Sequence, residues 1–149
     1  MLVYRIVLSK YADRLFSPGR AGRWNPNDVE MIYAASSRSL ACLENVVHRG
    51  ATGLTQLFTV LVINIPDQLE IKTIRLKDLP HSWADFDQIH RTQTMGHNWI
   101  KSAESAILQV PSSIIQEETN FLMNPKHADF SKIKIVDKQP FIFDSRVKL

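Results

Sequence analysis

One acidic residue lies on a segment that otherwise has the pattern of a buried helix. Three apolar residues of this segment recur at helical spacing along one face: Leu40, Leu43 and Val47. Glu44 completes their i, i+3, i+4, i+7 stripe with a carboxylate. A carboxylate turned towards a core is costly unless a neighbour hydrogen-bonds it or pairs with it. We therefore expect polar partners for Glu44, with the upstream residues Tyr33 and Arg23 as candidates. Structural ion pairs also bury acids, so a structural role stays open.

An arginine follows a glycine-containing loop. Gly22 permits close backbone approach, and Arg23 carries a guanidinium fork that suits bidentate contact with a carboxylate or phosphate. The loop is not a Walker or dinucleotide fingerprint, because it lacks the phosphate-loop lysine and does not lie between a strand and a helix in the required order. Pairing of Arg23 with a surface acid is the alternative interpretation.

Other polar residues lie on or after short apolar runs. Tyr33 lies on a strand candidate, where a ring packs in the core and a buried hydroxyl needs a partner. Ser112 follows a predicted strand, where side chains can point into a cleft, although a turn serine is the commoner case. No nucleophile motif such as Gly-x-Ser-x-Gly surrounds Ser112. Turn formation is expected of Asn120, Asn124 and His127, and His48 has no distinguishing context.

The elements that must position these residues are short. Strands are predicted over residues 2–7, 31–34, 57–65, 70–76, 106–110, 133–136 and 141–143. The strand over 57–65 is predicted to be a central strand of the sheet. Helices are predicted from a cap at Ser36 or Ser37 to a stop at Gly50, and over 83–89 and 92–103. Residues 17–28 and 118–130 are expected to be turn and loop. Many short strands with a few helices, without βαβ alternation, predict an α+β fold of small mixed or antiparallel sheets.

Composition excludes several classes of protein. The chain has 149 residues, 44% of them hydrophobic, which suits one domain over 1–149. No apolar run reaches membrane-spanning length, and the N-terminus is charged too soon for a secretory signal. A single cysteine, Cys42, fits a reducing cytoplasm, and the histidines lack metal-ligand spacing. A net charge of +3 suits an anionic small molecule or an acidic partner but is too weak to indicate nucleic acid.

Five motifs in chain order resemble the RES domain family. They are Gly22-Arg23-Trp24-Asn25, Ile32-Tyr33-Ala34-Ala35, Ser39-Leu40-Ala41-Cys42-Leu43-Glu44, Val110-Pro111-Ser112, and Asn120 through Asn124-Pro125-Lys126-His127. The family is named for an arginine, a glutamate and a serine, which correspond here to Arg23, Glu44 and Ser112. The C-terminal run from Phe141 to Arg146 is also similar to the family pattern. Ala21 and Asn27-Asp28 depart from it, since glycines are expected there.

This resemblance implies a bacterial toxin of a type II toxin–antitoxin pair. The expected partner is an Xre-type antitoxin with a helix-turn-helix domain, which would supply DNA contact in place of this chain. The expected fold is similar to that of ADP-ribosyltransferases, with NAD bound as substrate in a cleft between sheets. The implied assembly is a toxin dimer within a larger cytoplasmic complex, without membrane, metal or further cofactor.

The resemblance also assigns expected roles to six residues. Glu44, Arg23, Tyr33 and Ser112 are the expected catalytic residues. NAD binding is expected of Arg23, Tyr33, Ser112, Arg5 and Asn25. Arg23 is expected at the pyrophosphate or a neighbouring ribose, Arg5 is a second candidate for the pyrophosphate, and Ser112 is expected at the nicotinamide ribose. Nicotinamide is a cationic leaving group, so one carboxylate can suffice where ordinary glycosidases need two.

The implied chemistry has more than one acceptor. Water or phosphate as acceptor would deplete NAD, whereas a protein acceptor would make the chain an ADP-ribosyltransferase that uses the same site. A non-enzymatic module that acts through its antitoxin is a third alternative. The residues of the site do not separate the first two alternatives, because those two differ only in the group that accepts the ribose.

Overall fold

A computed structural model describes residues 1–49 and 56–147 of the chain, and within them seven strands form one mixed sheet in the order β4-β5-β6-β2-β1-β3-β7. The strands are β1 (Leu2–Leu8), β2 (Ile32–Ala35), β3 (Phe58–Asn64), β4 (Ile71–Thr73), β5 (Ile107–Pro111), β6 (Thr119–Met123) and β7 (Lys134–Phe141). The helices are α1 (Arg38–Arg49) and α2 (Ile89–Ser102). The pair β4–β5 is parallel and the other neighbours are antiparallel, so the predicted α+β class is confirmed.

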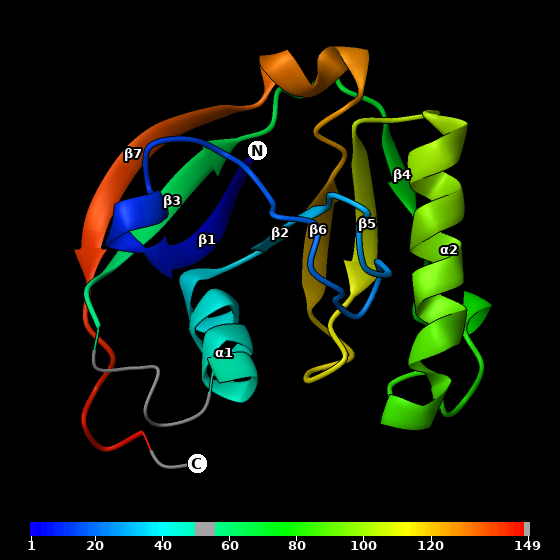
Figure 1. The fold of residues 1–149 in the computed structure, drawn as a ribbon, viewed down its shortest axis with the longest axis horizontal. Helices are drawn as coiled ribbons and strands as arrows, with labels where there is room; N and C mark the ends of the chain where they lie inside the picture. Colours follow the sequence, from blue (N-terminus) through cyan, green and yellow to red (C-terminus); the bar gives the residue numbers. More distant parts are fainter. Residues whose placement is uncertain (50–55, 148–149) are drawn as a thin grey trace.

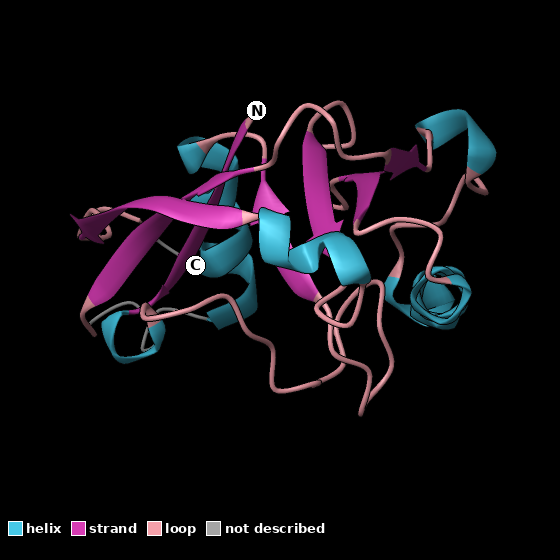
Figure 2. Ribbon diagram, turned by 90° about the horizontal axis from the view of Figure 1, so that it is seen from above, coloured by secondary structure: helices cyan, strands magenta, loops and turns pink. Residues whose placement is uncertain are grey.

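The sheet is joined weakly at its middle. β1 and β3 pair along seven positions, whereas β1 and β2 meet through Tyr4 and Ala35. In Figure 1, β1, β3 and β7 cross the view diagonally, while β5 and β6 run nearly vertically. α1 lies beside the half that contains β1, β3 and β7, and α2 flanks the half that contains β5 and β6. Figure 2 shows α2 end-on. The expected small sheets are therefore two halves of one sheet, which diverge where β1 leaves β2.

Helix α1 begins as predicted but turns a different face to the core. The Ser37 hydroxyl accepts a hydrogen bond from the Leu40 amide at 3.0 Å, which caps the first turn. The buried residues of the helix are Leu40, Ala41 and Val46. Val47 is 54% exposed, so the predicted stripe through Leu40, Leu43, Glu44 and Val47 is wrong. α1 packs on the sheet through Leu40, Ala41 and Val46, whereas Glu44 stays partly exposed. The predicted stop at Gly50 lies outside the described residues.

Several other elements differ from the prediction. Residues 119–123, expected in a loop, form β6, which pairs with both β2 and β5 and buries Phe121, Leu122 and Met123. β3 is an interior strand, paired with β1 on one side and β7 on the other, although it is next to last in the order of the sheet. Of the two predicted C-terminal strands, 133–136 falls, apart from its first residue, in a longer edge strand, β7, whereas residues 142 and 143 of the second lie outside it. Pro140 is tolerated in β7 because an edge strand needs no backbone donor on its outer side. Residues 83–89 contain a 3-10 turn, Phe86–Gln88, in place of a helix, and β4 is shorter than 70–76.

Helix α2 ends at an alanine with left-handed backbone. Ala103 has φ 50°, a conformation that costs a residue with a Cβ atom but not glycine. The variant Ala103→Gly is expected to raise the free energy of unfolding by about 1 kcal/mol, or Tm by about 2–4 °C. Thermal unfolding followed by circular dichroism measures this change. An unchanged or lower Tm would contradict the assignment of strain to this position.

No helix among the described residues is both long enough and apolar enough to cross a bilayer.

Candidate functional site

A cavity of about 520 Å³ opens where β1 and β2 diverge. Its walls come from β1, the loop before β2, β2 itself, α1 and the start of β6. The Arg5 guanidinium spans the gap between the two strands and donates a 2.7 Å hydrogen bond to the Tyr33 carbonyl. This side-chain bond stands in for a backbone bond that the separated strands do not make, so the Tyr33 carbonyl keeps a donor.

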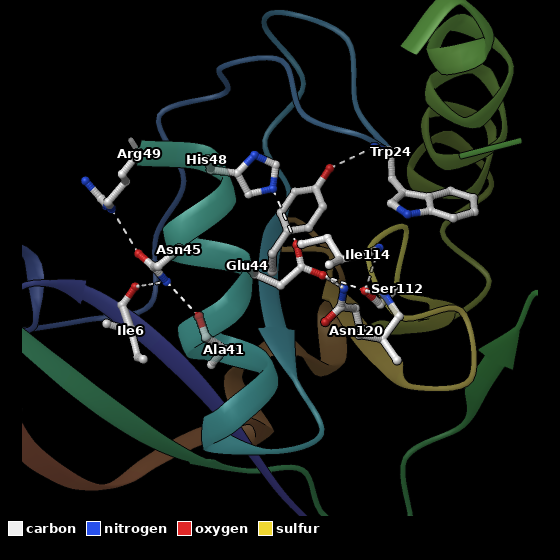
Figure 3. Close-up of polar contacts among 12 residues, drawn as sticks. Ile6, Trp24, Ala41, Glu44, Asn45, His48, Arg49, Ser112, Ile114 and Asn120 are labelled. Carbon is white, nitrogen blue, oxygen red and sulfur yellow. Dashed lines mark hydrogen bonds and ion pairs between the residues drawn. The ribbon is translucent and has the colours of Figure 1, made fainter. Parts of the chain in front are cut away.

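Glu44 points from α1 across the cavity towards the other half of the sheet (Figure 3). Its Oε1 accepts hydrogen bonds from the Ser112 hydroxyl at 2.9 Å and from the Asn120 side-chain amide at 2.6 Å. Its Oε2 lies 3.4 Å from Nε2 of His48, one turn along the same helix. The predicted need for polar partners is therefore met, but the predicted partners are wrong, because Tyr33 and Arg23 bond elsewhere.

These contacts keep Glu44 ionised. Burial opposes the charged form and raises the pKa of Glu44, but the neighbouring His48 and the hydrogen bonds from Asn120 and Ser112 outweigh it and hold the pKa below its ordinary value. A depressed carboxyl pKa contributes stability that is present above the unfolded-state pKa and is lost as the pH falls through the folded-state pKa. The carboxylate is therefore charged at neutral pH and part of the folded structure.

Removing one donor tests this electrostatic arrangement. The variant Asn120→Ala is expected to raise the pKa of the Glu44 carboxyl, because a hydrogen bond to its charged form is lost. Any activity that needs the positioned carboxylate should fall about 10-fold, as expected when one hydrogen bond to a charged group is lost. Carboxyl NMR titration measures the pKa, with the exposed-site variant Asn98→Ala as control. An unshifted titration would show that Asn120 does not stabilise the ionised form.

Ser112 lies behind Glu44 rather than on the cavity wall. It is fully buried, and its hydroxyl accepts hydrogen bonds from the Ile114 and Ile115 amides while donating to Glu44. The turn after β5 therefore orients the Ser112 hydroxyl, and this hydroxyl in turn holds the Glu44 carboxylate in position. Ser113, the next residue, lines the cavity instead.

The loop that carries Arg23 is held by helix α2. The Thr92 hydroxyl donates to the Arg23 carbonyl, and the Gln93 side-chain amide donates to the Gly22 carbonyl at 2.9 Å. Gly96 packs so closely on the loop that a Cβ atom there would lie 1.8 Å from the Trp24 carbonyl oxygen. These contacts hold the backbone of Arg23, and its side chain lines the cavity while its guanidinium also donates to the Asp85 carbonyl.

Tyr33 and Asn25 complete the support of this loop. The Tyr33 hydroxyl donates to Asn25 Oδ1 at 2.6 Å and accepts from the Trp24 amide, and burial raises its pKa well above the ordinary value. The Asn25 amide donates to three loop carbonyls, and Asn25 is fully buried. Gly22 leaves room for this pair, because a Cβ atom there would lie 2.8 Å from the Tyr33 hydroxyl oxygen. Asp28 adopts φ 67°, the left-handed conformation that the expected glycine would favour.

Four arginines line the cavity, together with a single carboxylate. They are Arg5, Arg20, Arg23 and Arg49. Among the described residues, none of the four forms an ion pair with an acid. Arg23 instead donates to the Asp85 carbonyl at 3.2 Å. Burial and the charge of Arg49 lower the pKa of Arg5 to about 10. A cavity with this excess of guanidinium groups suits an anionic ligand.

The six residues singled out from the sequence therefore separate into two groups. Glu44, Arg23, Tyr33 and Arg5 line the cavity, whereas Ser112 and Asn25 support its wall. Sequence reasoning missed Asn120, His48 and Arg49. The i, i+4 spacing of Glu44 and His48 was a readable signal, since such residues meet on a helix surface. Within residues 1–49 and 56–147, no group of three or more His, Cys, Asp or Glu side chains could hold a metal ion.

Comparison with known proteins gives consistent matches over almost the whole chain. The family model described as "RES domain" matches residues 2–144. The chain is 40% identical to the Prs ADP-ribosylating toxin of Sphingobium sp. (strain YBL2), over 85% of this chain and 80% of that protein. It is 35% identical to Toxin Res of Yersinia enterocolitica, over 99% of this chain and all of that protein. Toxin Res of Photorhabdus laumondii is 36% identical, over 99% and 97% of the two chains.

A solved structure shares the fold at much lower identity. A chain in the crystal structure of the M. tuberculosis MbcT–MbcA toxin–antitoxin complex aligns with a TM-score of 0.78. The alignment covers 95% of this chain and 84% of that chain at 17% identity. At this identity the likeness concerns the fold.

Proposed function

This chain belongs to the RES domain family, and from that premise we propose that it is a toxin of a bacterial toxin–antitoxin pair that cleaves the nicotinamide–ribose bond of NAD. Water or inorganic phosphate is the proposed acceptor, so that the reaction depletes NAD. The observation that carries this proposal is one ionised carboxylate, held by two donors, in a cavity that is otherwise rich in arginine.

The cavity suits the charge and size of this substrate. NAD carries a pyrophosphate, which arginine binds through two parallel hydrogen bonds. Arg23 and Arg5 are the proposed pyrophosphate ligands, because both line the cavity, Arg5 from β1 and Arg23 from the loop before β2. A volume of about 520 Å³ lies within the range of small-molecule and cofactor sites.

Glu44 is the proposed catalytic residue. The bond between ribose C1′ and the nicotinamide ring nitrogen breaks, and its electron pair neutralises that positively charged nitrogen. The ribose is left as an oxocarbenium-like centre, and an ionised carboxylate close to it stabilises the developing positive charge. The acceptor oxygen then bonds to C1′, and its proton passes to solvent. No general acid is needed, which fits a cavity with one carboxylate.

The other residues act on Glu44 or on the substrate. Ser112 and Asn120 are proposed as positioning residues, because both donate to Oε1, so that Oε2, which lies beside His48, is the oxygen proposed to face the ribose. Tyr33 is proposed to pack its ring against the nicotinamide end, with its hydroxyl committed to Asn25. Asn25 is proposed to shape the NAD site through the loop, since it is fully buried.

Protein ADP-ribosylation through the same site is the second candidate. It is favoured by the 40% identity to a relative named as a Prs ADP-ribosylating toxin. In this reaction the first bond cleavage is unchanged, and a protein side chain replaces water or phosphate at C1′. The acceptor thus decides between depletion and modification.

NAD labelled in its ADP-ribose part separates these candidates. Purified protein, freed of any antitoxin, is incubated with the labelled NAD and a cell lysate, with and without phosphate. Depletion predicts label in small molecules alone, as ADP-ribose or its 1″-phosphate. Label on a protein band would support the transferase instead. Unchanged NAD in every arm would overturn both and favour a module that acts through binding.

The proposed partner is an Xre-type antitoxin with a helix-turn-helix domain. Support comes from the fold shared with a chain of a toxin–antitoxin complex. A dimer of this chain within that complex, action in the cytoplasm and a single domain over 1–149 complete the proposal. Co-expression with the neighbouring gene and light scattering of the purified complex test the partner and the stoichiometry.

A further inference from the structure

One group on the cavity wall belongs to a residue type that changes charge near neutral pH. His48 follows Glu44 by one helical turn, and its Nε2 lies 3.4 Å from Oε2 of Glu44 (Figure 3). The His48 side chain is 66% exposed and that of Glu44 is 18% exposed. The imidazole therefore lies on the solvent side of the carboxylate, where protons reach it freely.

The two oxygens of Glu44 have different surroundings. Oε1 is occupied by the Ser112 hydroxyl and the Asn120 amide. Among the described residues, the contact recorded for Oε2 is His48. A carboxylate that acts on substrate from this position must use Oε2, because Oε1 already has two donors. The state of His48 therefore decides what Oε2 can do.

We propose that His48 is a positioning residue that sets the pH range in which Glu44 works. This inference rests on the proposed cleavage of NAD. Neutral His48 donates from Nε2–H to Oε2 and orients the carboxylate without cancelling its charge. Protonated His48 is a full positive charge against the same oxygen, so the pair becomes neutral. The stabilisation of positive charge on the ribose then falls, and cleavage slows.

The other charged groups around the cavity do not account for a change in this pH range. Four arginines line it, namely Arg5 on β1, Arg20 and Arg23 on the loop, and Arg49 on α1. Arginine stays protonated, and even the lowered pKa of Arg5 is about 10. Tyr4 and Tyr33 contribute phenols, and burial raises the pKa of Tyr33 still further above this pH range. Histidine is the side chain that changes charge between about pH 5 and 8.

If His48 has this role, kcat and KM should depend on pH in different ways. As the pH falls through the histidine range, kcat for nicotinamide release should fall about tenfold per pH unit, because one protonation removes activity. KM should stay constant or fall, since an added positive charge favours a pyrophosphate. A merely structural role of His48 would leave this profile without an acid limb.

The test compares the pH profiles of wild type, His48→Gln and His48→Ala between pH 5 and 8. Glutamine keeps a donor for Oε2 and does not titrate, so His48→Gln should approach the wild-type rate at pH 8 and hold it down to pH 5. His48→Ala should be flat but about 10-fold slower, because the donor is lost. His90→Gln, an exposed histidine on α2 away from the cavity, should keep the wild-type profile.

Each outcome has a definite meaning. An acid limb that persists in His48→Gln would overturn the proposal, because another group would then cause it. Loss of all activity in His48→Gln at pH 8 would also overturn it, because His48 would then act as more than a donor. Wild-type cleavage of NAD at pH 8 is measured first, so failure of the proposed function is distinguished from failure of the His48 role.

Discussion

Replacing Glu44 by glutamine is expected to lower the rate of nicotinamide release from NAD by about 100- to 1,000-fold, the usual effect of losing one preorganised electrostatic contact. The shape of the side chain is kept, and its carbonyl oxygen can still accept from Ser112 and Asn120. The negative charge that stabilises the ribose is lost. We therefore expect Tm to change by less than about 3 °C, equivalent to about 1 kcal/mol.

A matched variant controls for the chemical change itself. Glu104→Gln makes the same substitution at an exposed glutamate that pairs with Lys72, outside the cavity. Its rate and Tm should equal those of wild type, because exposed ion pairs contribute little. If Glu44→Gln kept the wild-type rate, Glu44 would not be catalytic. If it instead lowered Tm strongly, the buried carboxylate would be a structural element.

The variant Gly96→Ala is expected to lower both the thermal stability and the rate of nicotinamide release, although Gly96 does not line the cavity. The added Cβ atom would lie 1.8 Å from the Trp24 carbonyl oxygen, so α2 and the Arg23 loop must separate. Overpacking of about 3 kcal/mol, offset by about 1 kcal/mol of helix propensity, predicts a net loss of about 2 kcal/mol and a Tm lower by about 4–8 °C. Displacement of Arg23 should reduce nicotinamide release by about 100-fold.

The variant Thr94→Ala is the control for Gly96→Ala, because it also introduces alanine into α2 but causes no steric clash. Thr94 is exposed on α2, two residues from Gly96, so its replacement should leave Tm within about 2 °C and activity unchanged. Differential scanning calorimetry and the nicotinamide assay measure the two effects. A Gly96→Ala protein as stable and as active as wild type would mean that α2 does not hold the loop in place.

Local sequence patterns predicted the elements that consist of an unbroken run of residues of one type or that carry a clear capping residue. The β-branched and aromatic runs at 2–8 and 58–64 form β1 and β3, and Ser37 caps α1. β6 escaped prediction because Thr119 and Asn120 open it and Asn124-Pro125 follow it, so turn-forming residues flank a buried run of three. The buried face of α1 depends on how the helix sits against β1, which no local pattern encodes.

A residue of the site could be predicted from the sequence where a polar or charged side chain interrupts an apolar segment. Glu44 was found because a carboxylate interrupts an apolar segment, and its partners were missed because the sheet order brings them together. Asn120 lies 76 residues from Glu44 in the chain and reaches it because β6 is the neighbour of β2. Resemblance to the family supplied Ser112, and the structure adds that it acts on Glu44 from behind the wall.

The most direct test of the central claim is a crystal structure of the Glu44→Gln protein with NAD, which the variant should bind without cleaving. We expect the pyrophosphate of the bound NAD to lie against the cavity arginines and the nicotinamide ribose to be in hydrogen-bonding contact with the side chain at position 44. NAD bound outside the cavity, or bound with its nicotinamide end directed away from residue 44, would contradict it. An empty cavity at an NAD concentration that saturates binding in solution would contradict it as well.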